Sequence, residues 1–257
     1  MTPAALALLG VFGLIIGSFL NVCIGRIPAG ESVASPGSRC PSCRTPIAWY
    51  DNVPVLSYLI LRGRCRACRV TISARYPIVE LVTAAAFVLQ GTAIGEDWPM
   101  LVSRLIFTSL LIVLFGTDFD TQRLPNVLTY PGIVVGLIGS VWLPPGVVEC
   151  VIGAALGAGL LLTIRAIWYR VRGVEALGLG DVKMLAMIGA FLGWRQILVV
   201  LFLSVLAGSV IGGAATVVGN RTLQTRMAFG TFLAVAAFVA SICGTSLIDW
   251  YVAVSGI

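Results

Sequence analysis

Two aspartates, Asp118 and Asp181, lie where long apolar runs of the sequence meet short polar loops. The chain has only 11 acidic residues, and a carboxylate at the edge of an apolar run is costly unless it has a partner or a function. Two carboxylates that share one proton can activate a water molecule and protonate a leaving nitrogen, the two proton transfers that peptide hydrolysis requires. The pair therefore predicts a site of acid–base chemistry.

Asp181 ends the sequence Gly-Leu-Gly-Asp at 178–181, where a helix is predicted to begin. By itself this position suits a helix cap as well as a catalytic group, because a helix N-terminus favours a negative charge. Gly178 and Gly180 would let the backbone approach a substrate closely or adopt a positive φ. Lys183 either stabilises the carboxylates or extends to lipid phosphates.

The composition places these residues in a membrane protein. Hydrophobic residues make up 58% of the 257 residues, and the mean hydropathy is +1.00, more than a soluble domain of this length can bury. Runs of membrane-spanning length predict eight helices, with seven as the main alternative because the sixth run is short. The predicted spans lie near 3–25, 77–94, 99–117, 126–143, 147–168, 182–193, 196–219 and 228–251. The first lacks a basic segment before it and a cleavage site, so we expect a retained helix.

The basic residues orient the predicted spans. Eight of the 17 basic residues lie between the first and second spans, which predicts a cytoplasmic loop and puts both termini outside. If successive spans cross the membrane in opposite directions, 15 of the 17 basic residues lie on the cytoplasmic side. Only Arg104 and Arg195 then lie on the far side. The later cytoplasmic residues are Arg123, Arg165, Arg170, Arg172, Lys183, Arg221 and Arg226. The same count places Asp118 and Asp181 at the cytoplasmic face.

Four cysteines in the first loop have the spacing of a zinc site. They form two Cys-x-x-Cys pairs, Cys40 with Cys43 and Cys65 with Cys68, separated by 21 residues. Four thiolates bind zinc tetrahedrally, and a zinc-ribbon-like fold would order so small a loop without a large core. Two disulfides are the alternative, which a reducing cytoplasmic loop disfavours. The basic charge of the loop follows from topology and anionic lipid, and no nucleic-acid partner is expected.

Glu80 and two glycine-rich runs are the remaining features of note. Glu80 should lie just inside the second span, where an acid is expensive unless it is functional or forms a salt bridge, for example with Arg75 or Arg26. The runs at 153–157 and 208–213 have the small-residue spacing of closely packed helices.

Several longer motifs lie between about residue 13 and residue 193. They are Gly-Ser-Phe-Leu-Asn-Val at 17–22, the two Cys-x-x-Cys pairs, the segments 49–58 and 75–80, Asp-Phe-Asp-Thr-Gln-Arg-Leu-Pro-Asn at 118–126, and Gly-Leu-Gly-Asp-Val-Lys at 178–183. In combination they resemble bacterial prepilin peptidases, also called type 4 prepilin leader peptidases, which are aspartic membrane proteases. The resemblance assigns catalysis to Asp181 and to Asp118, seven residues before Pro125, and leaves Asp120 as a charge at a helix edge.

The resemblance also implies a fold and a function. The expected fold is an all-α polytopic membrane protein with a first transmembrane helix at 1–25, a cytoplasmic four-cysteine loop domain at 26–76 and a transmembrane aspartic peptidase domain at 77–257. The implied activity is cleavage of type IV prepilins and type II secretion pseudopilins at the cytoplasmic face of the bacterial inner membrane. The implied partners are these precursor proteins and the lipid bilayer.

Many prepilin peptidases also methylate the new N-terminus with S-adenosylmethionine, and the resemblance assigns that activity to the region around the loop. Ala84 stands where relatives commonly have glycine, a difference that bears on methylation and leaves cleavage intact. A peptidase without methyltransferase activity is therefore one alternative. A non-catalytic zinc-ribbon adaptor gives no reason for Asp118 and Asp181, and a transporter would place acids near the centres of its spans.

Overall fold

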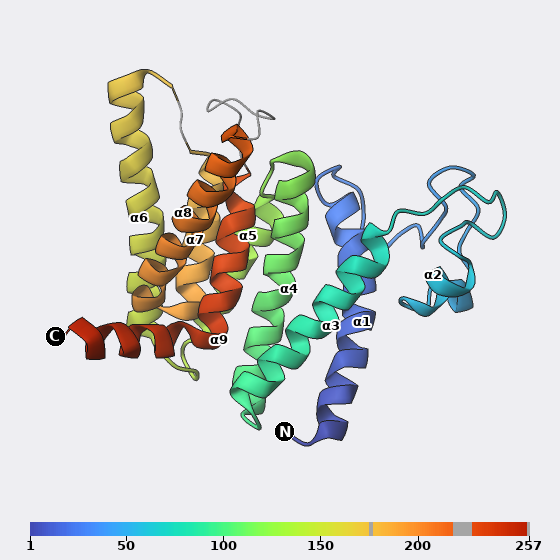
Figure 1. The fold of residues 1–257 in the computed structure, drawn as a ribbon, viewed down its shortest axis with the longest axis horizontal. Helices are drawn as coiled ribbons and strands as arrows, with labels where there is room; N and C mark the ends of the chain where they lie inside the picture. Colours follow the sequence, from blue (N-terminus) through green and yellow to red (C-terminus); the bar gives the residue numbers. More distant parts are fainter. Residues whose placement is uncertain (175–176, 218–227, 256–257) are drawn as a thin grey trace. The chain divides into compact units, whose positions relative to one another are not determined.

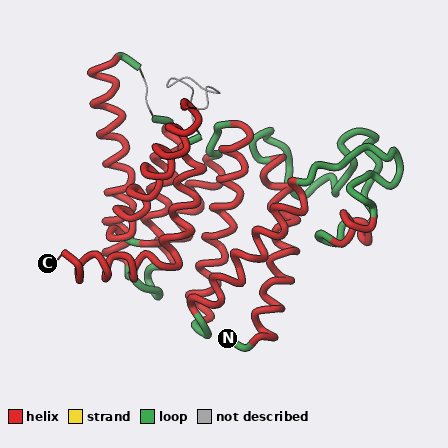
Figure 2. Tube along the Cα trace, in the orientation of Figure 1, coloured by secondary structure: helices red, strands yellow, loops and turns green. Residues whose placement is uncertain are grey.

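The computed structural model describes residues 1–174, 177–217 and 228–255, and in these ranges its regular structure is helical (Figures 1 and 2). Each of the eight predicted spans corresponds to a helix, so the predicted all-α fold is confirmed. These helices are α1 (Pro3–Arg26), α3 (Arg75–Ile94), α4 (Trp98–Thr121), α5 (Asn126–Gly139), α6 (Val147–Arg172), α7 (Leu179–Leu192), α8 (Trp194–Val217) and α9 (Phe229–Ser255). Arg221, Arg226 and the end of the predicted span at 219 lie outside the described residues.

The eight helices differ in whether they are long enough to cross a bilayer. Within the described residues, six are long and apolar enough to do so, namely α1, α3, α4, α6, α8 and α9. The other two, α5 and α7, have 14 residues each. At about 1.5 Å per residue such a helix is about 21 Å long, less than the roughly 30 Å of a hydrocarbon core. The fourth predicted span is shorter than expected, because residues 140–143 form turns after α5 ends.

The chain divides into two compact units, Met1–Val113 and Leu114–Ile257. In the first unit, α1 packs closely against α3 through two glycines four residues apart. A Cβ added at Gly13 would lie 2.6 Å from the Ala84 Cα, and one added at Gly17 would lie 2.7 Å from the Glu80 Cα. Side chains at these positions would force the helices apart, so the glycines allow the close contact.

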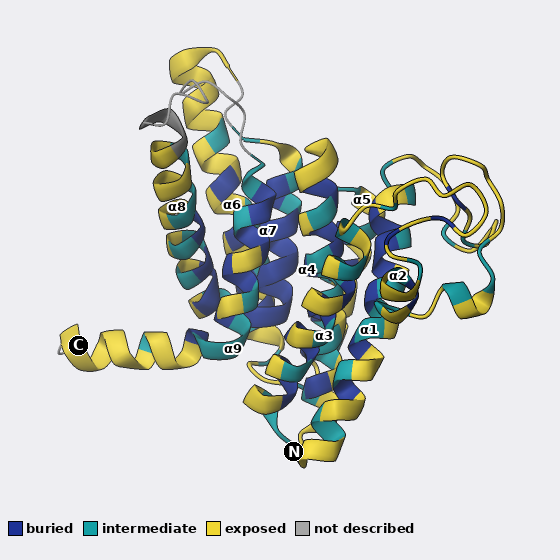
Figure 3. Cartoon of the chain, turned by 45° about the vertical axis from the view of Figure 1, so that its right-hand side comes forward, coloured by how far each residue is buried: buried dark blue, intermediate teal, exposed yellow. Residues whose placement is uncertain are grey.

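The second unit is built around α7, which contacts α5, α6, α8 and α9. Every residue from Asp181 to Leu192 except Lys183 is buried, and Figure 3 shows this helix almost entirely in the colour of buried residues. A helix that is apolar on all sides belongs in the interior of a protein. Its short length is therefore consistent with a helix that other helices surround. After α7, the positive φ of Gly193 (79°) makes a sharp turn directly into α8.

The predicted close packing of glycines is confirmed for the run in α6, whereas Gly208 and Gly213 of the second run do not show it. In α6, a Cβ at Gly153 would lie 2.7 Å from the Gly189 carbonyl oxygen of α7, and one at Gly157 would lie 2.8 Å from the Leu185 carbonyl oxygen. At Gly208, by contrast, the nearest atom is 3.8 Å away, and at Gly213 nothing lies within 4 Å. Spacing alone does not show which helix face meets a neighbour.

Gly189→Ala should destabilise the second unit, because the added Cβ would overlap the backbone of Gly153 and Ala154. Overpacking of this kind costs about 1–3 kcal/mol, so we expect a lower thermal midpoint for the detergent-solubilised protein. Gly159→Ala is the matched control, since nothing lies within 4 Å of its Cβ position on α6. Equal midpoints for Gly189→Ala and wild type would contradict the packing described here.

Candidate active site and metal centre

Asp118 lies near the end of α4, and the residue is only 5% exposed. Its Oδ2 accepts a hydrogen bond of 3.0 Å from the backbone N–H of Thr231, in the first turn of α9. Asp120, two residues further along, is exposed. The structure therefore distinguishes the two aspartates, because the side chain of Asp118 is buried in the second unit and that of Asp120 is exposed.

Asp181 is the third residue of α7 and is 9% exposed. Its carboxylate accepts a hydrogen bond from the backbone N–H of Gly178, the N-cap residue of the same helix, and it interacts electrostatically with Asp118. Asp181 thus caps its helix and also lies near the second carboxylate. Two buried carboxylates that interact in this way repel when both are ionised, and a single shared proton relieves that repulsion.

The glycines beside Asp181 leave room for neighbouring atoms and do not adopt unusual backbone angles. Gly178 is extended, with φ −72° and ψ 145°, and Gly180 is also outside the positive-φ region, so that part of the prediction is wrong. A Cβ at Gly180 would lie 2.9 Å from the Cβ of Leu124, which precedes α5. Leu124 was not identified from the sequence. Its packing against Gly180 explains why this position needs a residue without a side chain.

Lys183 makes contacts that neither of its predicted roles included. Its Nζ donates a hydrogen bond of 2.7 Å to the Asn126 Oδ1 and lies 5.3 Å from the centre of the Tyr130 ring. Both partners belong to α5, so Lys183 connects α7 to α5 just beyond the buried aspartate.

Arg165 of α6 holds the residue that precedes the Gly-Leu-Gly-Asp segment. Its Nη1 donates a hydrogen bond of 2.8 Å to the carbonyl of Leu177, one residue before the N-cap of α7. From the sequence, this arginine served only as a marker of topology. Its basic charge within a long apolar helix was the signal that could have identified it.

The four predicted metal ligands come together in the first unit. Their sulfurs all lie within 4.8 Å of one another, with Cys40 Sγ 3.8 Å from Cys68 Sγ and Cys43 Sγ 3.9 Å from Cys65 Sγ. Four sulfurs about 2.3 Å from a tetrahedral zinc ion would be about 3.8 Å apart, so the cluster fits zinc. All four cysteines are free, which excludes the disulfide alternative in this structure.

The two Cys-x-x-Cys segments have the same backbone geometry. In each, the residue after the second cysteine has a positive φ, 58° at Arg44 and 59° at Arg69. Its N–H donates to the carbonyl of the first cysteine, Cys40 or Cys65, at 3.0 Å. The segments therefore form two similar knuckles that present their thiols to one point.

The electrostatics of the thiols also suits a cation. The hydrogen bond with Thr45 lowers the pKa of Cys43 to about 6. The backbone N–H groups of Cys68 and Ala67 lower the pKa of Cys65. The pKa of Cys68 rises to about 11, against the opposing hydrogen bond from Val70, because the thiol is desolvated and lies beside the other sulfurs. Thiolates are the form that binds zinc, and a bound dication would stabilise the ionised form of all four.

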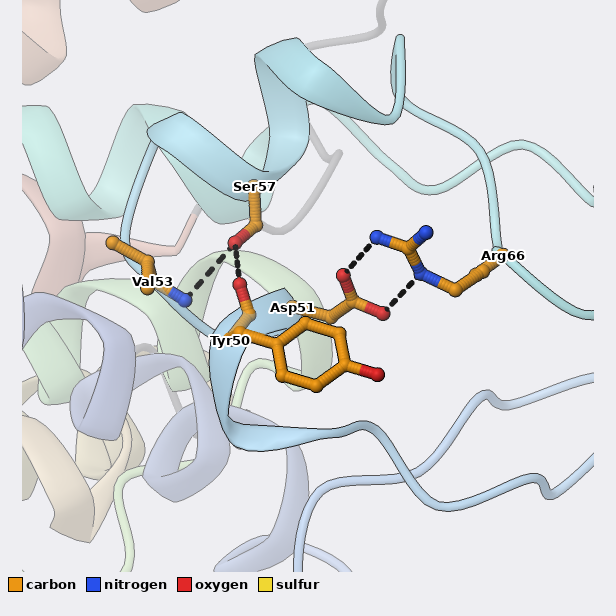
Figure 4. Close-up of polar contacts among 5 residues, drawn as sticks. All are labelled: Tyr50, Asp51, Val53, Ser57 and Arg66. Carbon is orange, nitrogen blue, oxygen red and sulfur yellow. Dashed lines mark hydrogen bonds and ion pairs between the residues drawn. The ribbon is translucent and has the colours of Figure 1, made fainter.

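A salt bridge joins the second knuckle to the middle of the loop (Figure 4). Arg66 donates two hydrogen bonds, of 2.6 and 2.7 Å, to the carboxylate of Asp51, and its guanidinium lies 5.7 Å from the centre of the Tyr50 ring. The arginine lowers the pKa of Asp51. The Ser57 hydroxyl donates to the Tyr50 carbonyl and accepts from the Val53 N–H. These contacts connect the knuckle to the 3-10 helix η1 (Trp49–Asp51) and to α2 (Leu56–Ile60).

Glu80 holds the same segment from α3. It is buried, and its Oε2 accepts a hydrogen bond of 2.7 Å from the backbone N–H of Val55, which has a positive φ of 60°. The predicted alternative of a salt bridge to Arg26 is wrong, because that guanidinium donates to the carbonyls of Ser32 and Gly37. Glu80 therefore anchors the four-cysteine loop to α3 within the first unit.

Two family models match the chain. Residues 11–94 match the bacterial peptidase A24 N-terminal domain, and residues 105–213 match the type IV leader peptidase family. No solved structure matches the chain.

Curated relatives cover most of the chain. A prepilin leader peptidase/N-methyltransferase of Aeromonas salmonicida is 36% identical over 274 residues, covering 95% of this chain and 93% of the relative. The Neisseria gonorrhoeae protein of the same name is 36% identical over 98% of this chain and 96% of its own length. The Myxococcus xanthus protein of that name is 42% identical over 82% of this chain and 63% of its own length.

Proposed function

The chain belongs to the type IV leader peptidase family, and from that membership we propose that it is a membrane aspartic endopeptidase that removes the leader peptides of prepilins and pseudopilins. The relatives' names pair this activity with N-methylation, so the proposed function includes methylation of the new N-terminus. The observation that carries the peptidase proposal is the burial of Asp118 and Asp181 beside each other in one unit.

The two aspartates would divide the proton transfers of hydrolysis between them. The ionised carboxylate takes a proton from water as the water oxygen attacks the peptide carbonyl carbon. The protonated partner then gives its proton to the nitrogen as the carbon–nitrogen bond breaks, which yields a carboxylate and an amine. The apparent pKa values of such a site belong to the pair rather than to one residue.

We place this chemistry at the cytoplasmic face of the bacterial inner membrane, with both termini outside. Asp118 lies three residues before the end of α4 and Asp181 in the first turn of α7, so both are at helix ends. The excess of basic residues in the loops assigned to the cytoplasm supports this orientation. A basic leader would reach the site from that side.

The cluster of four cysteines would hold a structural zinc ion. A site closed by four cysteines keeps no coordination position for water or substrate, so zinc there supplies folding energy to the loop. The residues that would ligate it are Cys40, Cys43, Cys65 and Cys68.

S-adenosylmethionine enters the proposal as the methyl donor, on the strength of the relatives' names alone. The backbone of Ala84, the position singled out for methylation, packs closely against Gly13 of α1. We therefore derive no step of methyl transfer from these residues.

Incubation of the membrane-embedded protein with a purified prepilin and S-adenosylmethionine tests both activities by mass spectrometry of the product. We expect removal of the leader peptide and one added methyl group at the new N-terminus. Without the methyl donor, the product should be cleaved and unmethylated. An intact prepilin would contradict the peptidase proposal, whereas a cleaved, unmethylated product in the presence of the donor would contradict methylation alone.

A further inference from the structure

The start of α9 meets the carboxylate of Asp118, although α9 lies beyond the residues that match the leader peptidase model. The geometry points to Gly230 and Thr231 as positioning residues that hold Asp118 in its catalytic orientation. This inference rests on the proposed peptidase function. It extends the active site to a helix outside residues 105–213, in a part of the chain that carries none of the sequence motifs.

Thr231 acts through its backbone rather than its side chain. Its N–H donates to the Asp118 Oδ2 in a buried contact of 3.0 Å and is shared with the Ala228 carbonyl at 3.2 Å. The Thr231 hydroxyl donates to the same Ala228 carbonyl at 2.6 Å and does not reach the carboxylate. Hydrogen bonds to ionised acceptors are stronger than neutral ones, and an N–H in the first turn of a helix has no helical partner four residues earlier. The N–H can therefore fix the carboxylate without weakening α9.

Gly230 provides the space in which that carboxylate lies. A Cβ at this position would be 2.8 Å from the Asp118 Oδ2 and 3.1 Å from its Cγ. Real Cβ atoms essentially never approach another atom below 3.0 Å, so any other residue must displace the carboxylate or the helix. Glycine at this position therefore leaves the space that the Asp118 carboxylate occupies, in a part of α9 that is regular helix.

One side chain packs against both the segment that contacts Asp118 and the segment that carries Asp181. Leu124 Cδ1 lies 3.0 Å from the Cβ position of Gly230, and Leu124 Cβ lies 2.9 Å from that of Gly180, the residue before Asp181. Leu124 thus fills the space between the start of α9 and the start of α7. Two glycines and one leucine set how closely Asp118 and Asp181 approach each other.

Gly230→Ala is the first test, with kcat and KM for prepilin cleavage measured separately. We expect kcat to fall about 100-fold, the scale of loss that a displacement of roughly 1 Å can cause. KM should stay near the wild-type value, because Gly230 would position Asp118 without contacting the substrate. Gly208→Ala on α8 is the matched control, since its Cβ would meet only ordinary van der Waals contacts, and it should retain wild-type kcat.

A backbone substitution isolates the hydrogen bond in case Gly230→Ala lowers the amount of folded protein. Replacing Thr231 by its α-hydroxy acid analogue converts the amide N–H to an ester oxygen and keeps the side chain, whereas Thr231→Ala keeps the N–H. We expect the ester to lose kcat and Thr231→Ala to keep it. Wild-type kcat in the ester variant, or an equal loss in Thr231→Ala, would overturn the inference. Failure of the wild-type protein to cleave would instead refute the proposed function.

Discussion

Replacing either Asp118 or Asp181 by asparagine is expected to lower kcat for prepilin cleavage at least about 1,000-fold, within the range that general acid–base groups contribute. Asparagine has nearly the same shape as aspartate but cannot accept and return a proton. Both variants should still insert, because the substitution removes a buried charge rather than a packing group. Initial rates in membranes that contain equal amounts of each variant, quantified by immunoblot, measure the loss.

Asp120→Asn is the matched control for this prediction. It changes the same side chain two residues away on the same helix, at an exposed position. We expect wild-type cleavage from it. If Asp120→Asn abolished cleavage and Asp118→Asn did not, the assignment of the catalytic aspartate would be wrong.

Loss of the four-cysteine site is expected to unfold the loop between α1 and α3. The purified protein should contain one zinc ion per chain, and the double variant Cys40→Ser/Cys43→Ser should contain none, because two of four ligands are removed. Structural zinc sites contribute an apparent binding free energy of about 10–16 kcal/mol, and a small loop has no core to replace it. Metal analysis and limited proteolysis of residues 26–74 would report the two effects together.

Cys243→Ser serves as the control for the zinc experiment, since Cys243 lies in α9 and outside the cluster. This variant should keep its zinc and its resistance to protease. A wild-type protein that binds no zinc even when zinc is supplied, or a double variant that retains one ion per chain, would refute the assignment.

Much of the fold could be predicted because a bilayer imposes simple rules on a sequence. Apolar runs of sufficient length must form helices there, and α1, α3 and α4 follow the predicted ranges within a few residues. The rules are weaker for α7, which other helices surround. Its apolar residues follow the same pattern as those facing lipid, so only the structure shows that this short helix lies at the centre of its unit.

The chemical groups of the site were also visible in the sequence, because carboxylates and paired cysteines are rare in such a chain. The residues that hold these groups in position were not visible in the sequence. Thr231 acts through a backbone N–H, which every residue except proline has, and it is separated from Asp118 by 113 residues. Gly230 and Leu124 determine the space around the carboxylates. That space depends on which helices pack together, and the sequence does not show this. Glu80 was noticed as a charge, but one of its partners is another backbone N–H, that of Val55.

The most direct test of the central claim, that Asp118 and Asp181 work as one unit, is the single-turnover cleavage rate of the double variant Asp118→Asn/Asp181→Asn compared with each single variant. Residues that share one chemical step are strongly non-additive, so losing the second adds little once the first is gone. We predict that the double variant is no slower than the slower single variant, within a factor of about three. The contrary result would be a double variant whose fold-loss in rate equals the product of the two single fold-losses. That result would contradict a shared site.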